Sequence, residues 1–183
     1  MDMGCNGGRL NTVWLYMKEF GIPADKCAPY VSGVSAVVPE CSDTCANGKE
    51  PKKYKAETAY SVVNWLDSPE DRVHKIKMDI LRNGPVEAAF WVFADFMAYK
   101  GGVYKHMTGG MMGGHAVKIV GWGEEKGADG KTTPYWTVAN SWGGAWGEDG
   151  FFRIEAGANQ CNIEMNIWAG LPDYKNAPVD DDE

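Results

Sequence analysis

The chain has 183 residues with 44% hydrophobic and 23% charged residues, a balance that excludes a mainly disordered protein and allows one large domain or two small ones. Its formal charge is −7, and Asp180–Glu183 supplies four of the negative charges, so the basic excess of a nucleic-acid binder or of a protein docked on an anionic membrane is missing. No stretch approaches the roughly 18 apolar residues of a membrane-spanning helix, and no secretory signal is recognised at the N-terminus.

The first predicted element is a helix over residues 11–20, where apolar side chains recur at helical spacing before Gly21 and Pro23. Residues 22–59 hold three of the five cysteines and show little periodicity. This pattern indicates an irregular region held by disulfides. The odd number of cysteines fits a protein with a free thiol or with an incomplete disulfide framework.

A second helix is predicted to begin after Ser68, which can cap it, with Pro69 in its first turn. Glu70 and Asp71 suit the positive end of the helix dipole. The stop signal is Asn83–Pro85 (Asn-Gly-Pro).

Beyond Pro85, short segments rich in β-branched and aromatic residues are separated by Gly-rich turns. The predicted strands are 86–93, 102–106, 115–122, 135–142 and 150–154. They indicate a small antiparallel sheet or barrel. The tail at 178–183 is predicted to be disordered.

The strands 115–122 and 135–142 predict a hairpin that carries a candidate site. If Gly123 pairs with Tyr135, a simple hairpin brings His115 near Asn140 at its open end, with a bulge or slip adjusting the register. An amide oxygen beside a histidine can fix the tautomer of the ring and aim its other nitrogen outward, as a catalytic base requires. Trp142 could screen the pair from water. The alternative is a surface hairpin with an incidental histidine.

Several ordered motifs in this chain resemble the papain-like cysteine peptidases, most closely their cathepsin B-like members. The motifs are Cys5–Gly8 (CNGG), Gly113–Ala116 (GGHA), Gly121–Gly123 (GWG), Asn140–Gly143 (NSWG) and Cys161–Glu164 (CNIE). The resemblance covers roughly residues 2–172.

The resemblance implies an α+β, papain-like two-domain fold. Residues 1–63 would be the remnant of a helical left domain that is mostly missing, with a disulfide-rich loop. Residues 64–172 would form the right domain, an antiparallel β-barrel, and residues 173–183 an acidic disordered tail.

The same resemblance assigns roles to individual residues. His115 and Asn140 match the catalytic histidine and its orienting amide. The matched substrate-binding positions are Gly7, Gly8, Met112, Gly114, Ala116, Trp142 and Asn166. Val92 and Met97 match positions on the primed side of the substrate site.

The remaining cysteines and histidines receive structural interpretations. Cys27 and Cys45 match a disulfide pair, Cys41 matches a cysteine whose partner lies upstream, and Cys161 matches a position that is commonly a free thiol. A zinc site made of these thiols is the alternative, but no paired CxxC and no nearby histidine supports it. His74 and His106 are expected at the surface. No metal or organic cofactor is implied.

The chain departs from the family pattern at the nucleophile. In relatives a Gln…Cys-Gly-Ser-Cys-Trp segment lies upstream of the CNGG motif, and this chain begins almost at that motif. Without the nucleophile and the oxyanion glutamine, the polypeptide is expected to be inactive alone. The competing explanations are a truncated gene model or fragment, a true pseudo-peptidase, and association with a separate nucleophile-bearing chain.

A second departure concerns specificity. Only 13 residues separate Cys27 from Cys41, and none is a histidine, so the two-histidine insertion that makes cathepsin B an exopeptidase is missing. The full-length parent is therefore expected to be a monomeric endopeptidase of lysosomal, vacuolar or secreted location. Its partners would be protein or peptide substrates and cystatin-type or propeptide inhibitors. The alternative function is a pseudo-peptidase that binds peptides or an inhibitor.

Overall fold

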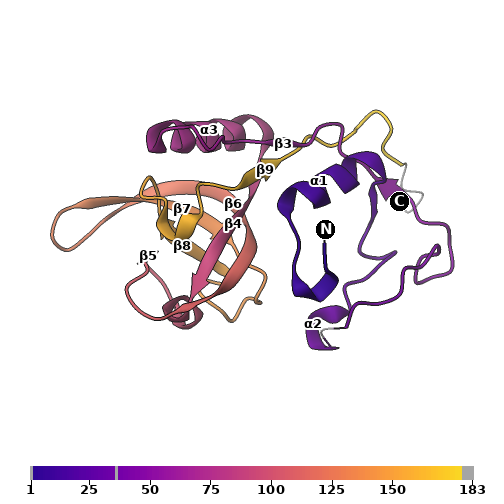
Figure 1. The fold of residues 1–183 in the computed structure, drawn as a ribbon, viewed down its shortest axis with the longest axis horizontal. Coiled ribbons are helices and arrows are strands. Elements are labelled where there is room, and N and C mark those ends of the chain that lie inside the picture. Colours follow the sequence, from indigo (N-terminus) through magenta and orange to yellow (C-terminus); the bar gives the residue numbers. More distant parts are fainter. Residues whose placement is uncertain (1, 36, 179–183) are drawn as a thin grey trace. The chain divides into compact units, whose positions relative to one another are not determined.

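The computed structural model describes residues 2–35 and 37–178, so the predicted disordered tail lies outside the described residues from position 179 onward. The chain divides into two compact units, Met1–Tyr60 with Gly170–Glu183, and Ser61–Ala169 (Figure 1). The chain thus crosses between the units three residues before each of the predicted limits at 63 and 172. Hydrogen bonds of Leu171 explain the second crossing, because its carbonyl accepts from Glu57 N–H and its N–H donates to the Thr58 hydroxyl oxygen.

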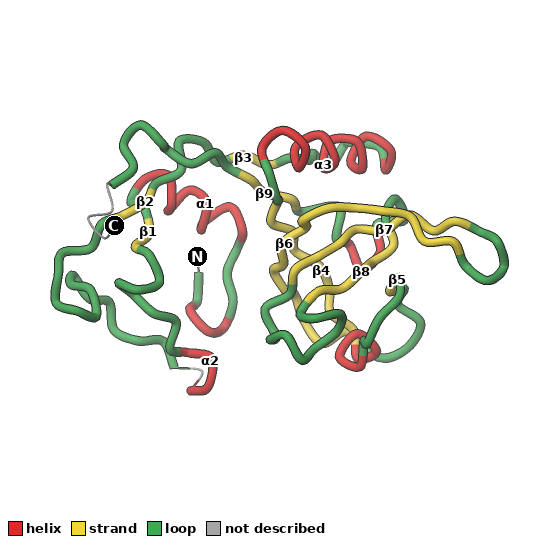
Figure 2. The backbone as a smooth tube through the Cα atoms, turned by 180° about the vertical axis from the view of Figure 1, so that it is seen from behind, coloured by secondary structure: helices red, strands yellow, loops and turns green. Residues whose placement is uncertain are grey.

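The first unit contains short elements joined by long loops, as Figure 2 shows in green. Its elements are η1 (Gly4–Asn6), α1 (Leu10–Glu19), β1 (Ile22–Pro23), α2 (Ser32–Ser35) and β2 (Lys53–Tyr54), with β1 and β2 paired antiparallel. Helix α1 confirms the predicted helix and ends at Glu19, and Gly21 follows the cap residue with φ 75°, a conformation that favours glycine. Within α1 only Leu10 is buried, while Val13 and Tyr16 remain about half exposed.

A disulfide between Cys27 and Cys45 closes a loop within the irregular region. The Ala46 N–H also donates to the Cys27 carbonyl, so the backbone is held at the same point. This pairing is the one that the family resemblance implies, and it removes two thiols from the alternative zinc site.

The second unit contains one long helix, α3 (Pro69–Asn83), which begins and ends as predicted. The Ser68 hydroxyl accepts from Asp71 N–H at 3.0 Å and donates to the Asp71 carboxylate at 2.8 Å. Gly84 ends the helix with φ 100°. Ile76 is fully buried, which fixes the face of α3 that packs inward.

A seven-stranded sheet follows the order β3-β9-β4-β6-β7-β8-β5. The strands are β3 (Tyr60–Ser61), β4 (Val86–Phe93), β5 (Val103–Tyr104), β6 (Met111–Lys126), β7 (Thr132–Ala139), β8 (Phe151–Glu155) and β9 (Ile167–Ala169). In this order β3 and β5 are the terminal strands, so among the described residues the sheet does not close into a barrel. Strand β5 also pairs parallel with β8, whereas the other pairs within β4 and β6–β9 are antiparallel.

The core of the second unit is aromatic at one end of this sheet. Phe96, in η2 (Ala94–Ala98), is fully buried, as are Trp136 and Phe152. Rings of Phe90, Tyr99, Tyr104, Trp142, Trp146 and Phe152 surround Phe96 with centroids 4.8–6.2 Å away. Burying this many rings rigidifies the ends of β4 and β7, where the candidate site lies.

Candidate functional site

The β6–β7 hairpin brings His115 and Asn140 together. Gly123 pairs with Tyr135 as predicted, and a bulge at Val120 then shifts the register. The His115 Nε2 and Asn140 Oδ1 atoms lie 2.9 Å apart.

The hydrogen bonds around Asn140 determine the tautomer of His115. The Ser141 N–H donates to Asn140 Oδ1 at 2.8 Å, which identifies the accepting atom as oxygen. Since this oxygen cannot donate, His115 Nε2 must carry the hydrogen that bridges the 2.9 Å contact. The Nδ1 atom of the neutral ring is then an acceptor, which is the form a general base needs.

Two aromatic rings lie next to the imidazole of His115. The Trp142 ring stacks on His115 with centroids 5.1 Å apart and an interplanar angle of 24°. Phe90, on β4, lies 6.0 Å away. Trp142 in turn contacts Trp146 and the buried Phe96. The rings limit both the rotation of the imidazole and its access to water.

The Asn140 Nδ2 atom is buried and has no hydrogen-bond partner among the described residues. A buried amide donor without a partner costs free energy. The amide is therefore oriented so that its oxygen accepts from His115 and Ser141, while its nitrogen makes no hydrogen bond to any described residue. This arrangement is typical of a functional group rather than of an incidental surface hairpin.

Two of the expected substrate-binding residues, Gly114 and Ala116, lie on the face of β6 opposite to His115. His115 pairs with Phe90 across the sheet, whereas Gly114 and Ala116 pair with Trp91 and Ala89 on the other face. Gly114, Ala116 and Met112 are exposed, and so is Asn166, whose carbonyl accepts from Ala89 N–H. Of the two primed-side positions, Met97 is exposed but Val92 is buried, because it shares the inward face of β4 with Phe90.

Gly7 and Gly8 belong to the first unit and follow η1. Gly7 has φ 103°, a conformation that favours glycine. A Cβ on Gly8 would approach the Asp2 carboxylate, which accepts from Arg9 N–H and the Thr12 hydroxyl. These bonds to Thr12 and Arg9 lower the pKa of Asp2. The glycines thus have locally fixed, side-chain-free backbone, as an edge for peptide pairing requires.

The described free cysteines have no activating environment. Cys41 is exposed, and Cys161 is half-buried. Burial, with a contribution from the charge of Asp95, raises the pKa of Cys161 to about 11. The thiolate is therefore scarce at neutral pH, as expected for a structural cysteine. The Cys5 side chain lies outside the described part of the structure.

A carboxylate network that sequence reasoning missed holds the loop before β6. Asp95 accepts from the Tyr104 hydroxyl, from Met107 and Thr108 N–H, and from His106. Although burial opposes ionisation, these hydrogen bonds hold the pKa of Asp95 well below its usual range. Burial and the Asp95 carboxylate raise the pKa of Tyr104.

His106 is only partly exposed, which corrects the expectation of a surface position. Its ring stacks on Phe93 at 3.8 Å while its Nδ1 contacts Asp95. No pattern in the sequence indicates this placement, because the contact with Asp95 spans 11 positions without any periodicity.

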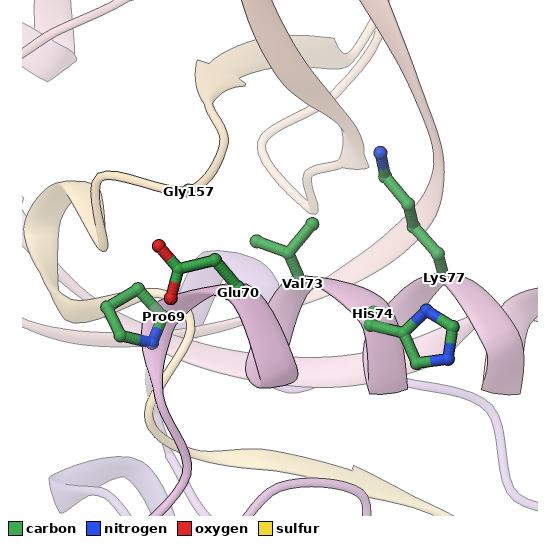
Figure 3. A pocket seen from close by; sticks show the side chains of 6 residues that line it. All are labelled: Pro69, Glu70, Val73, His74, Lys77 and Gly157. Atoms are coloured by element: carbon green, nitrogen blue, oxygen red, sulfur yellow. The ribbon is translucent and has the colours of Figure 1, made fainter.

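A separate hollow lies between α3 and the turn at Gly157 (Figure 3). Its lining residues are Pro69, Glu70, Val73, His74, Lys77 and Gly157. The side chains of Val73 and Lys77 extend from α3 on the side where Gly157 lies. The Lys77 Nζ atom lies 5.6 Å from the centre of the Trp122 ring. His74 is exposed, as expected. Over residues 2–35 and 37–178, no cluster of three or more His, Cys, Asp or Glu side chains could hold a metal.

Comparison with known proteins places this geometry in a family. The family model of papain family cysteine proteases matches residues 1–171. "Cathepsin B-like protease 1" of Arabidopsis thaliana is 41% identical over 180 residues, covering 94% of this chain and 46% of that protein. "Cathepsin B-like CP3" of Giardia intestinalis is 42% identical over 172 residues, covering 93% of this chain and 54% of that protein.

Solved structures of the same family share the fold of this chain. Procathepsin B S9 from Trypanosoma congolense has a TM-score of 0.79 at 38% identity, covering 93% of this chain and 55% of that one. Procathepsin L2 from Tenebrio molitor has a TM-score of 0.71 at 29% identity, covering 93% of this chain and 49% of that one. The chain spans about half the length of these relatives. With a family model matched over nearly all its length, the chain belongs to the papain family of cysteine proteases, among its cathepsin B-like members.

Proposed function

We propose that this chain supplies the histidine–asparagine half of a thiol-dependent endopeptidase that hydrolyses peptide bonds in proteins. The observation that carries the proposal is the 2.9 Å contact between His115 Nε2 and Asn140 Oδ1, with Nδ1 left as the acceptor. Asn140 also accepts from Ser141 N–H, so the amide cannot rotate to offer its nitrogen without losing a bond.

In the proposed reaction His115 Nδ1 takes the proton of a cysteine thiol, and the thiolate attacks the peptide carbonyl carbon. Asn140 keeps Nε2–H oriented, and the imidazolium then protonates the leaving amine. Water, deprotonated by the same histidine, attacks the thioester and releases the carboxylic acid. The thiolate that leaves recovers its proton from His115, so protons and bonds balance over the cycle.

The nucleophile in this proposal is not one of the cysteines placed in the structure. Cys27 and Cys45 form a disulfide, and Cys161 is half-buried with a raised pKa. We therefore propose that the thiol and the oxyanion donors come from a segment like the half of the relatives that this chain does not span. On this view the 183-residue polypeptide alone hydrolyses no peptide.

Substrate recognition would use the residues matched to substrate-binding positions. Gly7 and Gly8 would pair with an extended peptide backbone, Ala116 and Asn166 would bound a pocket for an apolar side chain, and Met112 and Trp142 would contact the primed side. The lack of histidine between Cys27 and Cys41 favours endopeptidase over exopeptidase action.

The family suggests the remaining properties of a full-length protein. Propeptide and cystatin-type inhibitors would bind the same site of a monomer in a lysosome, a vacuole or the extracellular space. In the described part of the chain no helix has the length and apolarity needed to cross a bilayer. No nucleic-acid or membrane partner is proposed.

A second candidate function is a pseudo-peptidase that binds peptides or an inhibitor without cleaving them. The environment of Cys161 favours it, because that thiol belongs to the Asp95 and Tyr104 cluster rather than to the His115 pair. The two candidates differ in what a supplied nucleophile would do.

The test joins a family-type N-terminal segment, with its Gln and nucleophilic Cys, to this chain. We expect thiol-dependent cleavage of dipeptidyl reporters by the joined protein and none by the 183-residue chain. His115→Ala should abolish cleavage, and Asn140→Ala should lower kcat by about 10- to 100-fold because the ring loses its orientation. A folded joined protein that binds inhibitor but never cleaves would support the pseudo-peptidase instead.

A further inference from the structure

The two central strands of the sheet present different faces. Cross-strand partners share a face, and Phe90 pairs with His115 while Trp91 pairs with Gly114. Phe90 is 2% exposed, whereas Trp91 is 43% exposed. An exposed indole therefore lies beside the residue that immediately precedes the histidine.

Small residues surround this indole. Ala89 and Ala116 form the next cross-strand pair on the same face, and Gly114 has no side chain. A Cβ on Gly114 would lie 3.5 Å from Trp91 Cζ3, so the ring packs against bare backbone. The small neighbours leave the indole uncovered, although burying a ring of this size would be favourable.

The surroundings of Trp91 are uncharged. On β6, residues 112–116 carry no ionisable group on this face, and the first charged pair is Lys118 opposite Glu87. The adjoining Met112 is 65% exposed. An apolar ligand group fits this strip, whereas a charged group would find no counter-ion there.

We infer that Trp91 is a specificity-determining residue, whose indole binds an aromatic or large aliphatic side chain of an extended peptide. The inference rests on the proposed function for the occupant, because Ala116, which is proposed to bound a substrate pocket, lies on the same face as Trp91. Aromatic side chains should bind most tightly, because offset or edge-to-face contacts with the indole add to the free energy from buried apolar area.

The test uses the 183-residue chain and does not depend on catalysis. Blocked alanine pentapeptides, each with one phenylalanine at a different position, are titrated into protein with ¹⁵N-labelled indoles. The Trp91 indole signal is identified by its loss in Trp91→Ala. We expect one phenylalanine position to shift this signal and to bind about tenfold more tightly than the all-alanine peptide, about 1.4 kcal/mol.

Three variants complete the test. Trp91→Ala should remove the tenfold phenylalanine preference, and Trp91→Phe should retain most of it. Trp65→Ala, at an indole that is 78% exposed elsewhere in the same unit, is the matched control and should change nothing. Equal affinity for phenylalanine and alanine peptides would overturn the inference, as would an unshifted Trp91 indole signal at millimolar peptide. The inference would also fail if a folded Trp91→Ala variant kept the same phenylalanine preference as Trp91→Phe and wild type.

Failure of the proposed function is recognised separately. If the joined protein cleaves nothing while Trp91 still selects phenylalanine, the peptidase proposal fails and the inference stands. If the joined protein cleaves reporters while Trp91→Ala and wild type show the same peptide preference, the inference fails and the peptidase proposal stands.

Discussion

Replacing Asp95 by asparagine tests the network that fixes the loop leading to His115. The carboxylate accepts from Tyr104 at 2.6 Å, Met107 N–H at 2.8 Å, Thr108 N–H at 3.1 Å and His106 Nδ1 at 3.1 Å. Asparagine keeps one accepting oxygen and places an NH₂ group against donors. At least part of the network must therefore break.

The size of the effect follows from the number of bonds. A hydrogen bond to a charged group contributes about 1.5–3 kcal/mol, and at least one donor loses its acceptor. Because the Asp95 side chain is 18% exposed, water compensates in part. We expect the free energy of unfolding of the second unit to fall by about 2–3 kcal/mol at pH 7.

This deficit, the loss of unfolding free energy in Asp95→Asn relative to wild type, should depend on pH in a defined direction. The pKa of Asp95 in the folded protein lies below its ordinary value of 3.8. Its stabilisation is therefore complete above that ordinary value and is lost as the pH falls through the lowered pKa. The loss of stability in Asp95→Asn should therefore persist between pH 7 and 5 and should shrink below about pH 4, where the wild-type carboxylate also begins to be neutralised.

Urea unfolding followed by tryptophan fluorescence at several pH values measures the deficit. The control is Asp129→Asn, because Asp129 is exposed and lies 3.9 Å from the exposed Lys131. This variant should change stability by less than about 0.5 kcal/mol. A deficit that is absent at pH 7, or that persists undiminished at the acid limit, would refute the assigned role of Asp95.

Three further predictions concern other parts of the chain. In the joined protein, Asn166→Glu should raise kcat/KM for an Arg-Arg reporter relative to Phe-Arg by about tenfold, because a carboxylate compensates the guanidinium; no response would remove Asn166 from the pocket. Glu164→Gln should lower the melting temperature, since the buried carboxylate accepts from Trp136 Nε1 at 2.9 Å and from two backbone N–H groups, at a cost of about 2–4 kcal/mol; an unchanged melt would contradict it. Replacing Cys27 and Cys45 by alanine should destabilise the first unit by about 3 kcal/mol, measured by hydrogen exchange against the second unit, which should not respond.

The elements with local signals were predictable from the sequence. Helix α3 has its cap at Ser68 and its stop at Gly84, and both functioned as expected. The pairing of Gly123 with Tyr135 followed from the turn between two strands of β-branched and aromatic residues. These features depend on neighbours in the sequence, so a pattern within a short window suffices to find them.

Features that depend on distant partners were not predictable. Strand β6 begins at Met111 rather than at 115, because β4 pairs with the Met-Met-Gly-Gly stretch, which has no β propensity of its own. Strand β5 pairs parallel with β8 and is the last strand of the sheet, an arrangement that no local pattern indicated. The Asp95 network likewise joins residues from either side of a loop, and a single aspartate in a sequence gives no sign of four donors.

The bulge at Val120 decides whether His115 and Asn140 can meet. Beyond the bulge Gly121 pairs with Thr137, and before it Ile119 pairs with Val138, so Val120 has no partner in the ladder. Continued one step past β7, this register places Asn140 opposite Val117. Side chains alternate between faces, so Asn140 then shares the face of His115 as its diagonal neighbour.

Without the extra residue, Asn140 would lie opposite Lys118 and would point to the other face, away from the imidazole. The 2.9 Å contact therefore requires an irregularity that strand propensity alone disfavours. The same alternation places Gly114 and Trp91 on the face opposite His115. The bulge thus places the amide of Asn140 on the same face as the base, His115. The opposite face, with Gly114 and Trp91, remains available for the side chains of a peptide.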